Sequence, residues 1–369
     1  MTEVKGNVIV GQSGGPTAVI NSSLAGVYKT AKERGFHKVY GMLHGIEGLL
    51  DEMYVDLSTQ IHSDMDIELL KRTPSAFLGS CRYKLPDIHE IPAFYEKIFA
   101  ILDKLDIEVF IYSGGNDSMD TIKKLSDYSL LNGSKIRFMG VPKTIDNDLW
   151  GTDMTFGFQS AVDVATNAID CIHTTAASHG RVFIVEVMGH KVGWLTLYAG
   201  LAGGADIILL PEIPYDINIV CDALTKRSKA GKRFSILAVA EGAISREEAG
   251  MSKKELKEKK KNSMVYPSVA YEIGARIQEV TGSEVRVTVP GHMQRGGEPC
   301  AYDRVLATRL GAAAARLIAD KEYGYMVAVK NNDITKVPLA EVAGKLKTVD
   351  PESSMIREAK MVGISFGDE

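Results

Sequence analysis

The segment "PKTIDND", residues 142–148, carries three residue types that phosphoryl transfer uses. Transfer to an alcohol needs a carboxylate that takes the hydroxyl proton, a cation beside the transferred oxygens, and usually Mg²⁺ held by oxygen ligands. Asp146 and Asp148 supply carboxylates and Lys143 supplies a cation. A string of this kind also forms turns whose Asx side chains bond the backbone, so the composition alone leaves both interpretations open.

Two glycine turns precede this segment. "GQSGGPTAVINSS", residues 11–23, follows the first apolar run, and "SGGNDSMD", residues 113–120, follows "VFIY". Backbone N–H groups at such turns, with the N-terminus of the next helix, can hold an anion. The first turn is not GxGxxG and lacks the lysine of GxxxxGK[ST], and ordinary strand-to-helix turns also need glycine. Two of them predict neighbouring loops on one sheet edge, which favours a polyphosphate ligand.

Short apolar runs alternate with helix-length segments along the chain. This rhythm is typical of parallel α/β sheets. The number of runs and the length of 369 residues predict two doubly wound, mostly parallel α/β lobes, with the active site in the cleft between them. The runs are "NVIVG", "KVYGML", "EVFIYSG", "IRFMGVP", "RVFIVEV", "IILLPE", "FSILAVAEG" and "VRVTVPG".

Composition and charge exclude several classes of protein. The chain is 45% hydrophobic and 24% charged, with a formal net charge of −4, so it has no general basic field for nucleic acid or a membrane surface. No stretch of eighteen apolar residues and no signal segment are present, which predicts a soluble cytoplasmic protein.

Four cysteines lie far apart, without a CxxC pair. This spacing argues against a disulfide framework or a zinc site, and we expect reduced packing residues. They are Cys81, Cys171, Cys221 and Cys300.

The segment "SREEAGMSKKELKEKKKN", residues 245–262, is the one marked shift in composition. Its mixed charges and single Leu256 are typical of a solvated helical hairpin or insertion. A basic interaction patch is the functional alternative, but interspersed acidic residues weigh against it.

Short motifs follow one another in order between about Gly11 and Arg304: "SGG", "LGSCR", "GGNDS", "PKTIDND", "GFQSA", "HGRVFIVEVMG", "AGGAD", "PE", "AEG" and "GHMQRGG". Together they resemble the bacterial type of phosphofructokinase, specifically its pyrophosphate-dependent branch. The resemblance implies a homo-oligomer, dimer or tetramer, that moves a phosphoryl group reversibly between pyrophosphate and fructose 6-phosphate. The products would be fructose 1,6-bisphosphate and phosphate, with Mg²⁺ as cofactor and a place in glycolysis and its reverse.

We assign residues 1–157, with about 294–345, to a phosphoryl-donor lobe. A sugar-phosphate lobe would comprise residues 158–293, with about 346–369, and would include the charged insertion near 245–262.

On the acceptor side, the resemblance implies that Asp146 is the base for the sugar 1-hydroxyl and that Thr144 positions the acceptor. Arginine forks suit a sugar phosphate dianion, while histidine and carboxylate groups suit hydroxyls. The remaining implied substrate contacts are Met188, Gly189, His190, Glu241, His292 and Arg295, with Arg181 and Arg286 reaching in from a neighbouring subunit.

On the donor side, ATP-using relatives carry Gly-Gly-Asp-Gly-Ser at the second turn and a small residue in place of Lys143. Here Asp117 and Lys143 fill those places, so we expect Asp117 to repel the α-phosphate of a nucleotide and Lys143 to neutralise pyrophosphate. We therefore count Asp117 and Lys143 with Asp146 as catalytic. The implied donor-binding residues are Gly15, Arg82, Asn116 and Ser118.

Three positions depart from the family pattern. Asn116 stands where an aspartate associated with Mg²⁺ is common, so Asp148 becomes the expected metal ligand, with Asn116 as a weaker second. His190 stands where ATP-using members have arginine, so stabilisation of the transferred group would pass to Lys143 and Arg82. Ala25 stands where effector-regulated relatives have an arginine, which predicts loss of allosteric anion binding.

Three alternatives remain open. The closest is an ATP-dependent 6-phosphofructokinase with an atypical pocket, which a comparison of donors would identify. A non-catalytic sugar-phosphate sensor on the same fold would bind without turnover, although Asp146 and the phosphate-binding residues are intact. A nucleotide-binding oxidoreductase would need GxGxxG and a ribose-binding acid, which the sequence lacks in the expected context.

Overall fold

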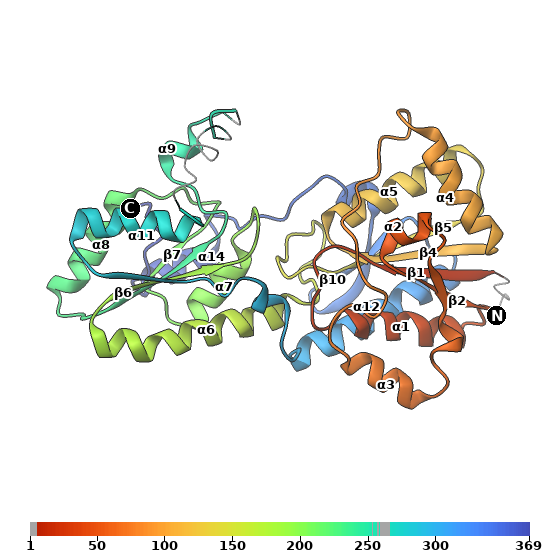
Figure 1. The fold of residues 1–369 in the computed structure, drawn as a ribbon, viewed down its shortest axis with the longest axis horizontal. Helices are drawn as coiled ribbons and strands as arrows, with labels where there is room; N and C mark the ends of the chain where they lie inside the picture. Colours follow the sequence, from red (N-terminus) through yellow and green to blue (C-terminus); the bar gives the residue numbers. More distant parts are fainter. Residues whose placement is uncertain (1–5, 253, 257, 259–265) are drawn as a thin grey trace. The chain divides into compact units, whose positions relative to one another are not determined.

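The computed structural model describes residues 6–252, 254–256, 258 and 266–369. The chain forms two compact units (Figure 1). Unit 1 is Met1–Ser160 with Arg295–Lys347, and unit 2 is Ala161–Gln294 with Thr348–Glu369. Their assignment to donor and sugar phosphate stays a prediction.

Unit 1 contains, among the described residues, a seven-stranded sheet in the order β11-β10-β5-β4-β1-β2-β3. The neighbours in β10-β5-β4-β1-β2 are parallel, and β3 and β11 pair antiparallel at the two edges. The strands are β1 (Asn7–Gln12), β2 (Val39–Met42), β3 (Tyr54–Asp56), β4 (Ile107–Gly114), β5 (Arg137–Pro142), β10 (Tyr325–Lys330) and β11 (Asp333–Pro338).

Two apolar cores cover the faces of this sheet. Alternate residues of one strand point to opposite faces, so Val109 and Ile111 of β4 belong to one core and Phe110 and Tyr112 to the other. One core includes α1 and α12, and the other includes α2, α4 and α5 (Figure 1). The helices of unit 1 are α1 (Ile20–Glu33), α2 (Gly45–Leu50), α3 (Asp64–Arg72), α4 (Pro92–Lys104), α5 (Asn116–Leu131), α12 (Ala301–Ala319) and α13 (Leu339–Val342), with the 3-10 turn η1 (Leu57–Thr59).

Helices α1 and α12 approach each other closely because glycines face the contact. A Cβ atom on Gly26 would lie 2.3 Å from the carbonyl oxygen of Thr308, and one on Gly311 would lie 2.0 Å from that of Ser23. Any side chain at either position would force the two helices apart. This close packing against α12 fixes the position of α1, the helix that follows Gly14 and Gly15.

Unit 2 contains a parallel sheet in the order β7-β8-β6-β9. Its main core lies between this sheet and helices α8 and α11. The elements are α6 (Phe158–His179), which begins in unit 1, β6 (Val182–Val187), α7 (Trp194–Ala202), β7 (Ile207–Leu209), α8 (Ile217–Lys229), β8 (Ser235–Ala240), α9 (Arg246–Ala249), α11 (Val269–Thr281), β9 (Val285–Thr288), the 3-10 turn η2 (Gly291–Arg295) and α14 (Ser354–Met361).

The predicted fold class is confirmed: each of the eight apolar runs contains a strand, and the sheets are mostly parallel. None of the described helices is long and apolar enough to cross a membrane. All four cysteines are free thiols, as predicted, but Cys171 is exposed, so its assignment to packing is wrong.

The predicted insertion, residues 245–262, lies partly outside the described residues. Within the described part, Ser245 and Glu248 form a capping box that begins the short helix α9.

Candidate functional site

The turns that follow β1, β4 and β5 lie side by side in unit 1. These three strands are parallel neighbours, so their carboxyl ends share one edge of the sheet. The amide of Ser13 donates to the carbonyl of Ser113 at 2.9 Å, and the amide of Lys143 donates to that of Gly114 at 3.0 Å. The prediction that the two glycine turns are neighbours on one edge is therefore confirmed.

Lys143 is a buried cation at the base of the first glycine turn. Its Nζ donates to the carbonyl of Gly15 at 2.8 Å, and a Cβ atom on Gly14 would lie 3.1 Å from the same nitrogen. Burial lowers the pKa of Lys143 to about 8, against the attraction of Asp146, which raises it. The sequence-predicted donor residue Gly15 thus contacts the sequence-predicted cation directly.

Two arginines surround Lys143. A Cβ atom on Gly15 would lie 3.0 Å from Cζ of Arg295, and both Arg295 and Arg82 help to lower the pKa of Lys143. The sequence grouped Arg295 with His292, but Arg295 belongs to unit 1 and lies beside the donor-side residues. We call Lys143, Arg82 and Arg295 the cation cluster.

Asp148 is a buried carboxylate beside this cluster. Its Oδ2 accepts from Nδ2 of Asn116 at 2.7 Å, while Oδ1 is buried and has no hydrogen-bond partner among the described residues. Burial, followed by repulsion from Asp146, raises the pKa of Asp148 to about 7. Thr144 lies on the same loop and accepts from the amide of Asp146 through its Oγ1 at 3.1 Å.

The described residues include no group of three or more His, Cys, Asp or Glu side chains arranged to hold a metal ion. Phosphoryl-transfer sites, however, commonly hold Mg²⁺ with one or two carboxylates plus the substrate's phosphates. The orphaned Oδ1 of Asp148, with Asp146 close enough to repel it, fits that arrangement. Asn116 orients Asp148 through its N–H group.

Asp117 lies in the first turn of α5, where a carboxylate interacts well with the helix dipole. Its side chain is 62% exposed and forms an ion pair with Nζ of Lys84 at 3.0 Å. Lys84 was not predicted from the sequence. Ser118, one residue on, is buried, and its Oγ donates to Oγ of Ser13 at 2.9 Å, so it joins the two glycine turns.

In unit 2, residues that follow β6 meet a residue that follows the adjacent β8. The amides of Gly189 and His190 donate to Oε1 of Glu241 at 3.3 and 2.7 Å. The amide of Met188 donates to Oε1 of Gln294 at 3.1 Å, a contact that the sequence did not suggest. The structure therefore brings Met188, Gly189 and His190 together with Glu241, while His292 is exposed on η2.

Arg181 and Arg286 do not join this group. Both pair with Glu284, Arg181 through Nε at 2.5 Å. Arg181 directly precedes β6, whereas Met188 directly follows it, and seven residues of extended strand span about 23 Å. The two arginines lie outside reach of Met188 and Glu241 of their own chain, since Arg286 pairs in register with Phe183 near the start of β6.

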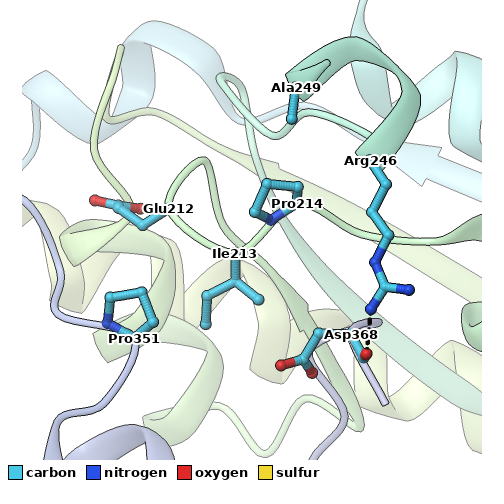
Figure 2. Close-up of a pocket in the computed structure, with 7 residues that line it drawn as sticks. All are labelled: Glu212, Ile213, Pro214, Arg246, Ala249, Pro351 and Asp368. Carbon is cyan, nitrogen blue, oxygen red and sulfur yellow. Dashed lines mark hydrogen bonds between the residues drawn. The ribbon is translucent and has the colours of Figure 1, made fainter.

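A pocket of about 390 Å³ in unit 2 contains none of the predicted residues. Its lining is Glu212, Ile213, Pro214, Arg246, Ala249, Pro351 and Asp368 (Figure 2). Arg246 extends from α9 and donates to the backbone carbonyl of Asp368. Glu212 accepts from the amides of Gly193 and Val349, which ties two segments of unit 2 together.

The sequence model of the family described as "Phosphofructokinase" matches residues 7–318. The chain belongs to the phosphofructokinase family. It is 46% identical over 363 residues to a protein of Spirochaeta thermophila named ATP-dependent 6-phosphofructokinase, with 96% of each chain covered. A protein of the same name from Chloroflexus aurantiacus is 40% identical over 377 residues, with both chains fully covered.

Two solved structures of this family carry the other donor in their names. The pyrophosphate-dependent phosphofructokinase of Nitrosospira multiformis is 29% identical, with a TM-score of 0.82 over 95% of this chain and 87% of that one. That of Marinobacter aquaeolei is 29% identical, with a TM-score of 0.80 over 98% and 92%. The names of the more similar curated relatives favour ATP, so they favour the alternative over the predicted pyrophosphate.

Proposed function

We propose that the protein transfers a phosphoryl group to the 1-hydroxyl of fructose 6-phosphate and that its donor is pyrophosphate. Membership of the family supports the acceptor. The observation that carries the choice of donor is the buried Lys143 ammonium on the carbonyl of Gly15. The choice of pyrophosphate is proposed separately from the reaction, because this chain resembles both ATP-dependent and pyrophosphate-dependent members of the family.

The cation cluster suits a small, highly charged donor. A buried ammonium is costly without an anion to compensate it, and the lowered pKa of Lys143 expresses that cost. Pyrophosphate would place several negative oxygens against Lys143, Arg82 and Arg295 and would recover the cost on binding. The same cations would stabilise charge on the transferred group.

Asp117 supports exclusion of a nucleotide. Its carboxylate stands at the start of α5, one residue beyond Asn116, and Lys84 holds it there. An α-phosphate that approached the start of this helix would meet a like charge, whereas pyrophosphate has no such group.

Asp146 would take the proton of the 1-hydroxyl, and Thr144 would position the acceptor. The acceptor hydroxyl would become a nucleophile as it loses that proton. Mg²⁺, held by Asp148 and by substrate phosphates, would neutralise charge on the phosphoryl oxygens. Asn116 would keep Asp148 in place through its hydrogen bond at 2.7 Å.

The sugar side would use both this chain and a second copy. Glu241, with Met188 and Gly189, would contact the sugar, and His292 the 6-phosphate. Arg295, which lies beside Gly15, would contact the donor instead. The position of Arg181 at the opposite end of β6 from Met188 supports its use by a neighbouring copy, together with Arg286. The proposal therefore includes a homo-oligomer with shared sites.

ATP is the second candidate donor. The specific observation in its favour is that relatives 46% and 40% identical over nearly the whole chain are named ATP-dependent. The sugar-phosphate residues and Asp146 would serve either donor in the same way.

An assay of fructose 1,6-bisphosphate formation tests the proposal. Purified protein is given fructose 6-phosphate and Mg²⁺ with either pyrophosphate or ATP, and Asp146→Asn serves as the control for contaminating activity. We expect product with pyrophosphate and little with ATP. Product with ATP alone would refute the donor, and no product with either would refute the reaction.

A further inference from the structure

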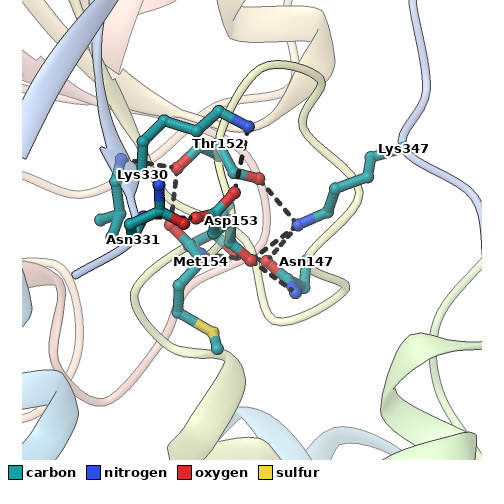
Figure 3. Close-up of polar contacts among 9 residues, drawn as sticks. Asn147, Thr152, Asp153, Met154, Lys330, Asn331 and Lys347 are labelled. Carbon is teal, nitrogen blue, oxygen red and sulfur yellow. Dashed lines mark hydrogen bonds and ion pairs between the residues drawn. The ribbon is translucent and has the colours of Figure 1, made fainter. Parts of the chain in front are cut away.

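Lys347 forms hydrogen bonds with Asn147, Thr152 and Asp153 (Figure 3). Asn147 lies between Asp146 and Asp148 in the sequence. The Nζ of Lys347 donates to Oδ1 of Asn147 at 2.9 Å and to the carbonyls of Thr152 and Asp153 at 2.9 and 3.0 Å. Three oxygen acceptors match the three N–H groups of an ammonium. Lys347 lies 200 residues along the chain from Asn147, and nothing in the sequence around it indicated a role.

Asn147, between the two carboxylates, is the residue that most needs this support. It is buried with a φ of 52°, the left-handed region that costs a side chain about 1–2 kcal/mol, although asparagine tolerates it better than most. Its Oδ1 accepts from Lys347 and from the amide of Thr155 at 3.0 Å. This left-handed conformation sets the path of the backbone between Asp146 and Asp148, so the directions of the two carboxylates depend on it.

The backbone around Lys347 is joined to the same loop. Its amide donates to the carbonyl of Asp148 at 2.9 Å, and Leu346 forms an antiparallel bridge with Leu149. The ammonium and the amide of one residue thus hold both sides of the turn. The positive charge of Lys347 also attracts the Asp148 carboxylate, which Asp146 repels.

Lys330 provides a matched comparison in the same cluster. Its Nζ pairs with Oδ1 of Asp153 at 3.0 Å, and the amide of Asn331 donates to Oδ2. Lys330 therefore contacts the carboxylate of Asp153, whereas Lys347 contacts its carbonyl and Asn147 (Figure 3). Of the two lysines, only Lys347 bonds Asn147, which lies between Asp146 and Asp148.

We propose that Lys347 is a positioning residue for phosphoryl transfer, because its ammonium holds the Asn147 turn and with it the carboxylate of Asp146. The inference rests on the proposed function, in which Asp146 is the base. Lys347 touches neither substrate in this account and acts through the loop alone.

The test is a kinetic comparison of Lys347→Met with Lys330→Met, using the donor that the wild type prefers. We expect Lys347→Met to lower kcat about 10-fold or more while both KM values change less than about 3-fold, since geometry at the reacting centre and not substrate binding is lost. Lys330→Met should stay within about 2-fold. In an Asp146→Asn background, Lys347→Met should lower kcat by at most about 3-fold further, because the group that it positions is already gone.

The outcomes separate the inference from the proposed function. Wild-type kcat in folded Lys347→Met, or an equal loss in Lys330→Met, overturns the inference while Asp146→Asn still loses activity. Wild-type turnover in Asp146→Asn refutes the base itself and the inference with it. If Lys347→Met does not fold, the same criteria apply to Lys347→Gln, which removes the charge and keeps a neutral N–H donor at this position.

Discussion

Replacing Lys143 by methionine should lower turnover and raise the stability of the protein. Methionine keeps the length of the side chain and removes its charge beside Gly15. Loss of a preorganised charged donor at the reacting group costs about 3–4 kcal/mol, so kcat with pyrophosphate should fall about 10²–10³-fold. Steady-state kinetics with pyrophosphate and fructose 6-phosphate measure this loss.

The same change should stabilise the protein without ligands at pH 7. Burial lowers the pKa of Lys143 from 10.5 to about 8, so the folded state bears a cost of about 3 kcal/mol when the group is charged. Unfolded chains bind more protons than folded ones between pH 8 and 10.5, so stability rises over that range and the full cost remains below pH 8. The lost hydrogen bond offsets about 1 kcal/mol. A net gain of about 2 kcal/mol should raise the Tm of unit 1 by about 4–8 °C.

Lys124→Met is the matched control, because Lys124 donates to the carbonyl of Leu85 outside the cation cluster. It should leave turnover unchanged. Calorimetry at pH 7 and pH 10 separates the charge effect from packing, since the gain in Lys143→Met should shrink at the higher pH. A Lys143→Met protein that keeps wild-type turnover with pyrophosphate, or that loses stability at pH 7, would refute this reasoning.

Three further predictions concern the carboxylates and the shared site. Asp146→Asn should keep the fold and sugar binding but lower turnover by about 10²-fold or more, and wild-type turnover would exclude a base role. Asp148→Asn should raise the Tm, because burial raises the pKa of this carboxyl from 3.8 to about 7: the gain should be full above pH 7, shrink as the pH falls toward 4 and vanish below that. Mg²⁺ with pyrophosphate should raise the Tm of the wild type more than that of this variant, and an equal rise in both would exclude Asp148 as a ligand. Mixing inactive Asp146→Asn and Arg181→Ala proteins should restore some activity, and confirmed hybrid oligomers without activity would count against shared sites.

The central strands could be predicted from the sequence, because a strand that is buried on both faces consists of a continuous run of apolar residues. Strands β1, β4 and β5 are almost fully buried, and glycines mark the turns after β1 and β4. Strands β3 and β11 were not predicted, since their residues are half-buried or exposed and carry no continuous apolar run. Strand β10 is apolar, but an apolar run of six residues is not distinguished from the end of a helix by periodicity.

The candidate site was predictable only where its residues share a motif. Lys143, Thr144, Asp146 and Asp148 lie within six positions of one another, and the turn that carries them was evident from the sequence. The contacts of Gly15 with Arg295 and of Asn147 with Lys347 join residues about 200 or more positions apart. Such contacts depend on how helices and strands pack, which no local spacing records.

The most direct test of the central claim is a competition between the two donors in one reaction. Wild-type protein, fructose 6-phosphate and Mg²⁺ are mixed with equal concentrations of pyrophosphate and ATP, and ADP and phosphate are quantified against fructose 1,6-bisphosphate. If the donor is pyrophosphate, each mole of product is accompanied by one mole of phosphate, and ADP stays below about one part in a hundred, as expected for discrimination of about 3 kcal/mol. Formation of ADP in proportion to fructose 1,6-bisphosphate would contradict it.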